Sequence, residues 1–135
     1  MNTTKRLITG LVEYLGDMSP DEAITVCDAK RREDVDLPTL AVDVTSAEPH
    51  SVALANVMRT TVEITLRSHA GDETAETIDG WADDIEALLN DEDTMLSVLD
   101  DGIRVDHWLY QGSEEEWDES VVEIRFVAEC LVTRV

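Results

Sequence analysis

The sequence predicts an α+β fold: a mainly antiparallel β-sheet of about four strands, with helices packed on one face. Apolar residues recur at spacings of three and four in two segments, and they alternate with polar residues in four others. The strand segments follow one another in two pairs, which favours antiparallel pairing. With 135 residues, the chain has a usual length for one domain, so we expect residues 1–135 to form a single domain.

The first predicted element is a helix over residues 3–15, which Gly16 is expected to end. Residues 27–37 are charged, and we expect them to form an irregular segment. This segment contains the basic cluster Lys30, Arg31 and Arg32. We expect this cluster either to be a solvated, locally paired loop or to meet an acidic neighbour. The helix predicted over residues 3–15 has an apolar face whose residues are spaced three or four apart: Leu7, Leu11, Tyr14 and Leu15.

Two strands are predicted next. The first covers residues 39–45, after Pro38, and a loop containing Pro49 follows it. The second is the clearest half-buried strand of the chain, because its residues alternate strictly between two faces. One face holds Met58, Thr60, Val62, Ile64 and Leu66, and the other holds Arg59, Glu63 and Arg67.

A second helix is predicted over residues 73–90, with an apolar stripe and an acidic opposite face. Residues 91–99 are either a short further helix or a loop. The stripe consists of Ile78, Ala82, Ile85 and Leu89, with Trp81 and Leu88 beside it, and the acidic face of Glu76, Asp79, Asp83 and Glu86.

Two strands close the chain, over residues 103–111 and 121–134, with residues 112–120 as their connection. The last strand alternates cleanly, so one of its faces is expected to be buried. The strand 103–111 is apolar on both faces. Its first face holds Ile103, Val105 and Leu109, and its second holds Trp108 and Tyr110 beside Arg104.

Negative charge dominates the composition, with 31 Asp and Glu residues against 10 Lys and Arg residues and a net charge of −21. The acidic residues run through every segment, which indicates a folded domain with an anionic surface. At low salt such a surface repels itself, whereas at molar salt the screening length falls to about 3 Å. This pattern is typical of proteins from halophiles that accumulate salt, and an ordinary acidic mesophilic protein is the alternative.

No signal peptide and no long apolar segment is apparent, so a soluble intracellular product without a membrane partner is expected. The cysteines Cys27 and Cys130 lie far apart and are expected to be buried thiols. No catalytic site, metal site or cofactor is expected. Asp106 and His107 are neighbours on a strand, so they point to opposite faces. The acidic run 91–93 fails the EF-hand pattern, because Met95 stands where an oxygen ligand is needed.

The chain resembles the tail-terminator, or tail completion, proteins of long-tailed phages in layout and length, over roughly residues 7–132. The resemblance lies in an N-terminal helix, a strand after Leu37 and Pro38, a long strand, an acidic helix with a central tryptophan, and a final hairpin. Three segments carry most of it: the strand 62–67, the helix core Trp81, Ile85, Leu88 and Leu89, and the ending 125–129. With the charge pattern, it suggests a tailed virus of a haloarchaeon.

The resemblance implies a structural virion protein, not an enzyme, located at the tail-neck junction and assembled in the host cytoplasm. Such proteins form a homo-hexameric ring that ends tube polymerisation. The implied partners are further copies of the chain, the tail-tube protein and a neck or head-closure protein. DNA would only pass through the lumen, and no basic patch suited to gripping phosphate is evident. The alternatives are a head-closure or head-to-tail adaptor protein and, in another class, a small halophilic dimeric binding module.

Aromatic and arginine side chains are the types enriched at interface centres. For Trp108 and Tyr110, a contact with a partner and a cover by the N-terminal helix of the same chain are both open. Trp117 either docks a neighbour or folds back on its own sheet. The residues expected at subunit or tube contacts are Arg59, Arg67, Arg104, Trp108, Tyr110, Trp117 and Arg125.

Overall fold

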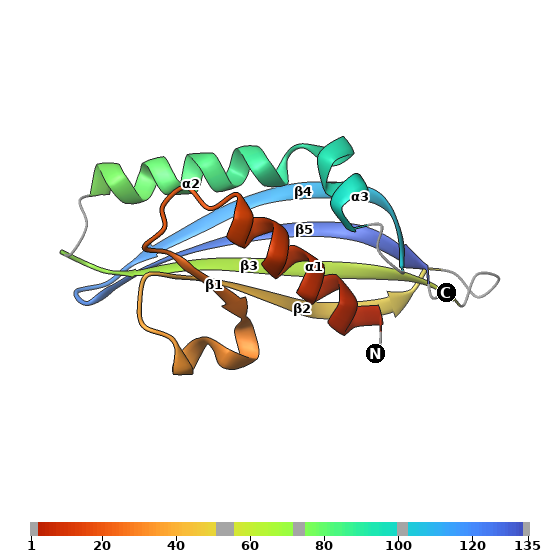
Figure 1. The fold of residues 1–135 in the computed structure, drawn as a ribbon, viewed down its shortest axis with the longest axis horizontal. Helices are drawn as coiled ribbons and strands as arrows, with labels where there is room; N and C mark the ends of the chain where they lie inside the picture. Colours follow the sequence, from red (N-terminus) through yellow and green to blue (C-terminus); the bar gives the residue numbers. More distant parts are fainter. Residues whose placement is uncertain (1–2, 51–55, 72–74, 100–102, 134–135) are drawn as a thin grey trace.

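The computed structural model describes residues 3–50, 56–71, 75–99 and 103–133. Three α-helices pack on one face of a five-stranded sheet with the strand order β1-β2-β3-β5-β4 (Figure 1). The elements are α1 (Thr3–Asp17), β1 (Thr25–Asp28), the 3-10 helix η1 (Ala29–Asp34), β2 (Thr39–Pro49), β3 (Val57–His69), α2 (Ala75–Leu89), α3 (Glu92–Leu99), β4 (Arg104–Trp117) and β5 (Val121–Thr133).

The predicted α+β class is confirmed, but the sheet is mixed and has one strand more than expected. The additional strand, β1, pairs parallel with β2, with Thr25 opposite Thr39 and Cys27 opposite Ala41. The other neighbouring strands pair antiparallel. The sequence did not reveal β1 because four residues are too few to show a period, and η1 follows it at once in the segment read as irregular.

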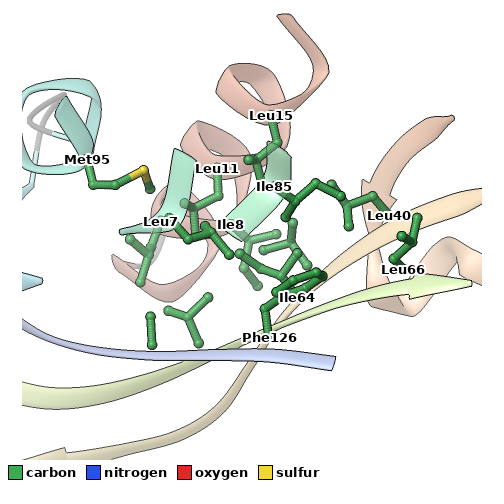
Figure 2. Packing of buried hydrophobic residues seen from close by; sticks show 14 of the residues in the cluster. Leu7, Ile8, Leu11, Leu15, Leu40, Ile64, Leu66, Ile85, Met95 and Phe126 are labelled. Carbon is green, nitrogen blue, oxygen red and sulfur yellow. The ribbon is translucent and has the colours of Figure 1, made fainter. Parts of the chain in front are cut away.

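The core lies between the helices and one face of the sheet (Figure 2). On the sheet side, β5 alternates strictly, with each even-numbered residue from Val122 to Val132 buried. Full burial of a large aliphatic side chain contributes about 1.5–3 kcal/mol, so Val122, Ile124 and Val132 each add to the stability of the fold. Leu7, Leu11 and Leu15 of α1, with Ile78, Trp81, Ile85 and Leu89 of α2, form the helix side.

The short helix predicted as one alternative for residues 91–99 is present as α3. Asp91 caps it, because its carboxylate accepts hydrogen bonds from Thr94 N at 3.2 Å and Thr94 Oγ1 at 2.7 Å. Such a cap satisfies a backbone donor that a helix start otherwise leaves unpaired. Met95 and Leu99 are then buried in the core.

Strand β4 departs from regular alternation at two places. Its pairing with β5 shifts between Asp106 and Leu109, where His107 has a φ of 56°, and again between Tyr110 and Gly112. Each extra residue reverses the side that the following residues face. Val105 and Trp108 therefore both point into the core, while Leu109 points outward and is 60% exposed. The expectation that Ile103, Val105 and Leu109 share one face opposite Trp108 is wrong for this reason.

The connection between the last two strands is shorter than predicted. Residues 112–117 belong to β4, and only residues 118–120 join it to β5. Asp118 closes this turn, because its Oδ1 accepts hydrogen bonds of 2.8 Å from Ser120 N and Val121 N. These backbone hydrogen bonds, the one from Val121 first, hold the pKa of the Asp118 carboxyl below its ordinary value.

Candidate interaction surfaces on the sheet

The face of the sheet opposite the α-helices, called the open face below, carries four of the residues expected at contacts. Paired residues of antiparallel strands share a face, so the register places Arg59, Arg67 and Arg125 there, beside the odd-numbered residues of β5. Arg104 lies on the same face opposite Thr133. The structure thus brings together four arginines that lie up to 66 residues apart in the chain (residues 59 to 125).

Each of these arginines has a carboxylate partner within the same chain. Arg59 lies 3.4 Å from Glu48, and Arg104 lies 3.2 Å from Asp106. Arg67 lies 3.5 Å from Glu123, while Arg125 lies 3.5 Å from Glu114 and 3.9 Å from Glu63. Partly exposed pairs of this kind contribute about 0–1 kcal/mol each to stability. Their main effect is that the open face offers arginines whose charge is already balanced.

Arg67 differs from the others in its burial. Its Nε atom is buried and makes no hydrogen bond with any described residue, although Glu123 Oε2 is 3.5 Å away. The pair is therefore an ion pair without a well-aligned hydrogen bond. Arg67 also lies close enough to Asp118 to favour the charged form of that carboxyl.

Trp108 is a core residue and not an exposed contact. It is 2% exposed, and its indole Nε1 donates a hydrogen bond of 2.7 Å to the carbonyl oxygen of Leu89. Between the two alternatives for Trp108, the cover by its own chain therefore holds, but the hydrogen bond ties it to the end of α2 and not to the N-terminal helix. The alternation of residue types could not reveal the bulge in β4, which reverses the face on which the following side chains lie.

Tyr110 is half-buried on the same side as Trp108, and its hydroxyl donates a hydrogen bond of 2.8 Å to Glu86 Oε2 of α2. Burial, together with this hydrogen bond, raises the pKa of Tyr110 to about 12. The side chain thus lies at the boundary between the core and the acidic side of α2.

Trp117 remains accessible at the end of β4. It is 45% exposed and lies opposite Val122, so it is on the helix side of the sheet but beyond the close packing of the core. Its neighbours on this side of β4 are Ser113 and Glu115, which lie opposite Phe126 and Ile124.

A groove of about 350 Å³ runs between α2 and β4 and is strongly acidic. Helices α2 and α3 contain no lysine or arginine, so no cation from either helix balances it. We call it the acidic groove, and its lining is Asp79, Ala82, Asp83 and Glu86 of α2, Ser113 and Glu115 of β4, and Ile124 and Phe126 of β5.

The basic cluster predicted in the irregular segment lies on η1, against β1 and β2. Lys30, Arg31 and Arg32, called the basic triad below, are all exposed. Among the ion pairs between described residues, none involves the triad. The structure therefore does not show the local pairing that one interpretation of this segment expected.

A second hollow, of about 410 Å³, opens where β4 bulges. Its lining combines the polar and charged residues His50, Arg59, Glu92, His107 and Glu129 with Trp108, Leu109, Cys130 and Leu131. Within the described ranges, no group of three or more His, Cys, Asp or Glu residues is arranged to hold a metal ion.

Both cysteines are buried thiols, as expected. Burial raises the pKa of Cys130 to about 12 and also raises the pKa of Cys27. The thiolate is the reactive form, so burial suppresses the reactivity of both.

Compared with models of known protein families and with curated proteins, the chain has no match. Of the helices in the described parts of the chain, none is long and apolar enough to cross a membrane.

Proposed function

We propose that this protein is a structural virion protein that forms a ring at the head-proximal end of a viral tail tube. There it ends tube polymerisation and joins the tail to the neck, while DNA passes through the lumen. The proposal starts from the resemblance in layout to tail-terminator proteins, whose helix, paired strands, acidic helix and final hairpin all have counterparts in this chain. The source proposed with it is a haloarchaeal tailed virus.

The observation that carries the proposal is the open face of the sheet. Proteins that grip DNA present unpaired cations that displace counterions from phosphates. Here each of the four arginines of the open face lies within 4 Å of a carboxylate. These paired arginines therefore offer phosphate no unpaired cation on this face, and the net charge of −21 adds no attraction for DNA, which favours passage of a genome over its capture.

The same charge sets the conditions in which a ring can form. Copies that each carry −21 repel one another over about 30 Å at 0.01 M salt but over only about 3 Å at 1 M. Assembly is therefore expected in molar KCl, in keeping with a halophilic host.

The length of tail tubes tests this function directly. The tube protein of the same virus is polymerised in molar KCl with increasing amounts of this protein, and tube lengths are measured by electron microscopy. We expect shorter tubes that carry additional density at one end. Tubes of unchanged length and bare ends would contradict the proposal. Density on a portal-side ring instead of the tube would favour a neck adaptor, and a dimer indifferent to both would favour an unrelated binding module.

A further inference from the structure

The two edges of the sheet carry opposite charge. Strand β4 forms one edge and β1 the other, since the strand order is β1-β2-β3-β5-β4. The β4 edge bears the acidic groove and the run Glu114, Glu115 and Glu116. The β1 edge bears the basic triad on η1. In Figure 1, α2 and β4 lie along the top of the molecule, and η1 is the orange helical turn at the bottom.

A symmetric contact between two copies would bring like charges together. Strand β4 is an edge strand of 14 residues, and an edge of this length is a natural site for pairing with another chain. In an antiparallel β4-to-β4 contact centred near residues 114–116, however, these glutamates of one copy would approach the same glutamates of the other, and like charges opposite one another destabilise a sheet. A contact between two basic triads would also bring like charges together. A contact between the basic triad of one copy and the acidic groove of another pairs opposite charges instead.

The acidic groove has the shape and chemistry to take an arginine or lysine side chain. Its carboxylates come from both α2 and β4, while Ile124 and Phe126 contribute apolar surface at its base. A guanidinium group binds carboxylates in a fork and also stacks on aromatic rings. Trp117 lies two residues beyond Glu115 on the same side of β4 and is exposed, so it offers such a ring beside the groove.

We propose that a second copy of this chain docks head to tail, with the basic triad on its η1 entering the acidic groove of the first. This contact is heterologous, so repetition gives a closed ring if the rotation between copies closes, and a filament if it does not. The inference deepens the proposed function, on which its ring geometry rests, by assigning the two surfaces that join neighbouring subunits. It also disfavours a symmetric dimer.

Paired charge reversals test the contact. One variant carries Arg31→Glu and Arg32→Glu, and the other carries Asp79→Arg and Asp83→Arg, which are exposed residues of η1 and α2. Each variant alone would face like charge across the contact, so we expect each to sediment as a monomer in molar KCl. In an equimolar mixture each altered edge meets its complement, so we expect alternating oligomers with the mass of the wild-type assembly.

A matched control separates the contact from net charge. The variant Glu13→Arg and Asp17→Arg changes net charge as much as the groove variant does, but at exposed positions of α1. We expect it to assemble like the wild-type protein. Far-ultraviolet circular dichroism in the same KCl solution checks that every variant is folded.

Two results would overturn the inference and leave different parts standing. If the single charge-reversal variants assemble as the wild-type protein does, the edges are not the contact, yet a ring remains. If the wild-type protein stays a monomer or forms a dimer up to millimolar concentration, with tubes present or absent, the head-to-tail contact is wrong. The tube-length measurement then decides separately whether the terminator function survives.

Discussion

The indole Nε1 of Trp108 donates a hydrogen bond of 2.7 Å to the carbonyl oxygen of Leu89, which ties β4 to the end of α2. This carbonyl belongs to the last turn of the helix, where backbone acceptors have no partner within the helix. The bond therefore satisfies a buried acceptor at the end of α2.

Replacement of Trp108 is expected to cost stability and not association. Trp108→Ala should lower the free energy of unfolding by about 3–5 kcal/mol through the cavity it leaves. Trp108→Phe should lower it by about 1–3 kcal/mol, because the Leu89 carbonyl loses its partner. Urea unfolding in molar KCl measures both. Trp117→Ala is the matched control and should change stability by less than about 1 kcal/mol, since that side chain is 45% exposed. Equal losses at the two positions would contradict this assignment.

Tyr110 is expected to make the protein less stable in alkali. Its pKa is raised to about 12 in the folded protein, against about 10 in an unfolded chain. The folded state then binds more protons between these values, so the stability that Tyr110 contributes is complete below pH 10 and is lost as the pH rises toward 12. The pKa of Cys130 is also raised, to about 12, so its contribution to stability is likewise lost as the pH rises above about 9.

The tyrosinate absorbance, recorded against pH, measures this effect. The wild-type protein should show a late step near pH 12 that is absent from Tyr110→Phe. The variant should also lose less stability between pH 10 and pH 12 than the wild-type protein does. A wild-type absorbance titration that is complete near pH 10, with no late step, would contradict the raised pKa of Tyr110.

Two glycines should respond to alanine in opposite directions. Gly80 lies in α2 with no atom within 4 Å of an added Cβ, so Gly80→Ala should stabilise the protein by about 0.5–1 kcal/mol. Gly112 has a φ of 118° at the second shift of β4, so Gly112→Ala should destabilise it by about 1–3 kcal/mol. Thermal unfolding of the two variants at one salt concentration measures both. A stabilising Gly112→Ala would mean that the second bulge is not formed.

The buried residues could be predicted from the sequence in those elements where one hydrophobic period continues along the whole element. Strand β5 and the buried face of β3 follow strict alternation, and the stripe of α2 follows the helical period, so these core residues were predicted correctly. Strand β4 was predicted too short and with the wrong facing. Its two register shifts depend on local backbone conformations, such as the positive φ of His107, that no alternation of residue types encodes.

The candidate surfaces could be predicted only in part, because the sequence pattern does not show which strands pair or in which register. Arg59 and Arg67 of β3 were assigned to one face because that strand is regular, but the carboxylate partner of Arg67 on β5 depends on the register between strands. The basic triad was visible as a cluster. Its place at the edge opposite the acidic groove depends on β1, which was too short to predict.

Sedimentation of the wild-type protein in molar KCl, alone and with tail tubes of the same virus, shows whether it forms a ring at the tube end. We expect a closed oligomer of about six subunits, or a monomer that assembles only on tube ends. A stable monomer or dimer that is unchanged by tubes would contradict this expectation.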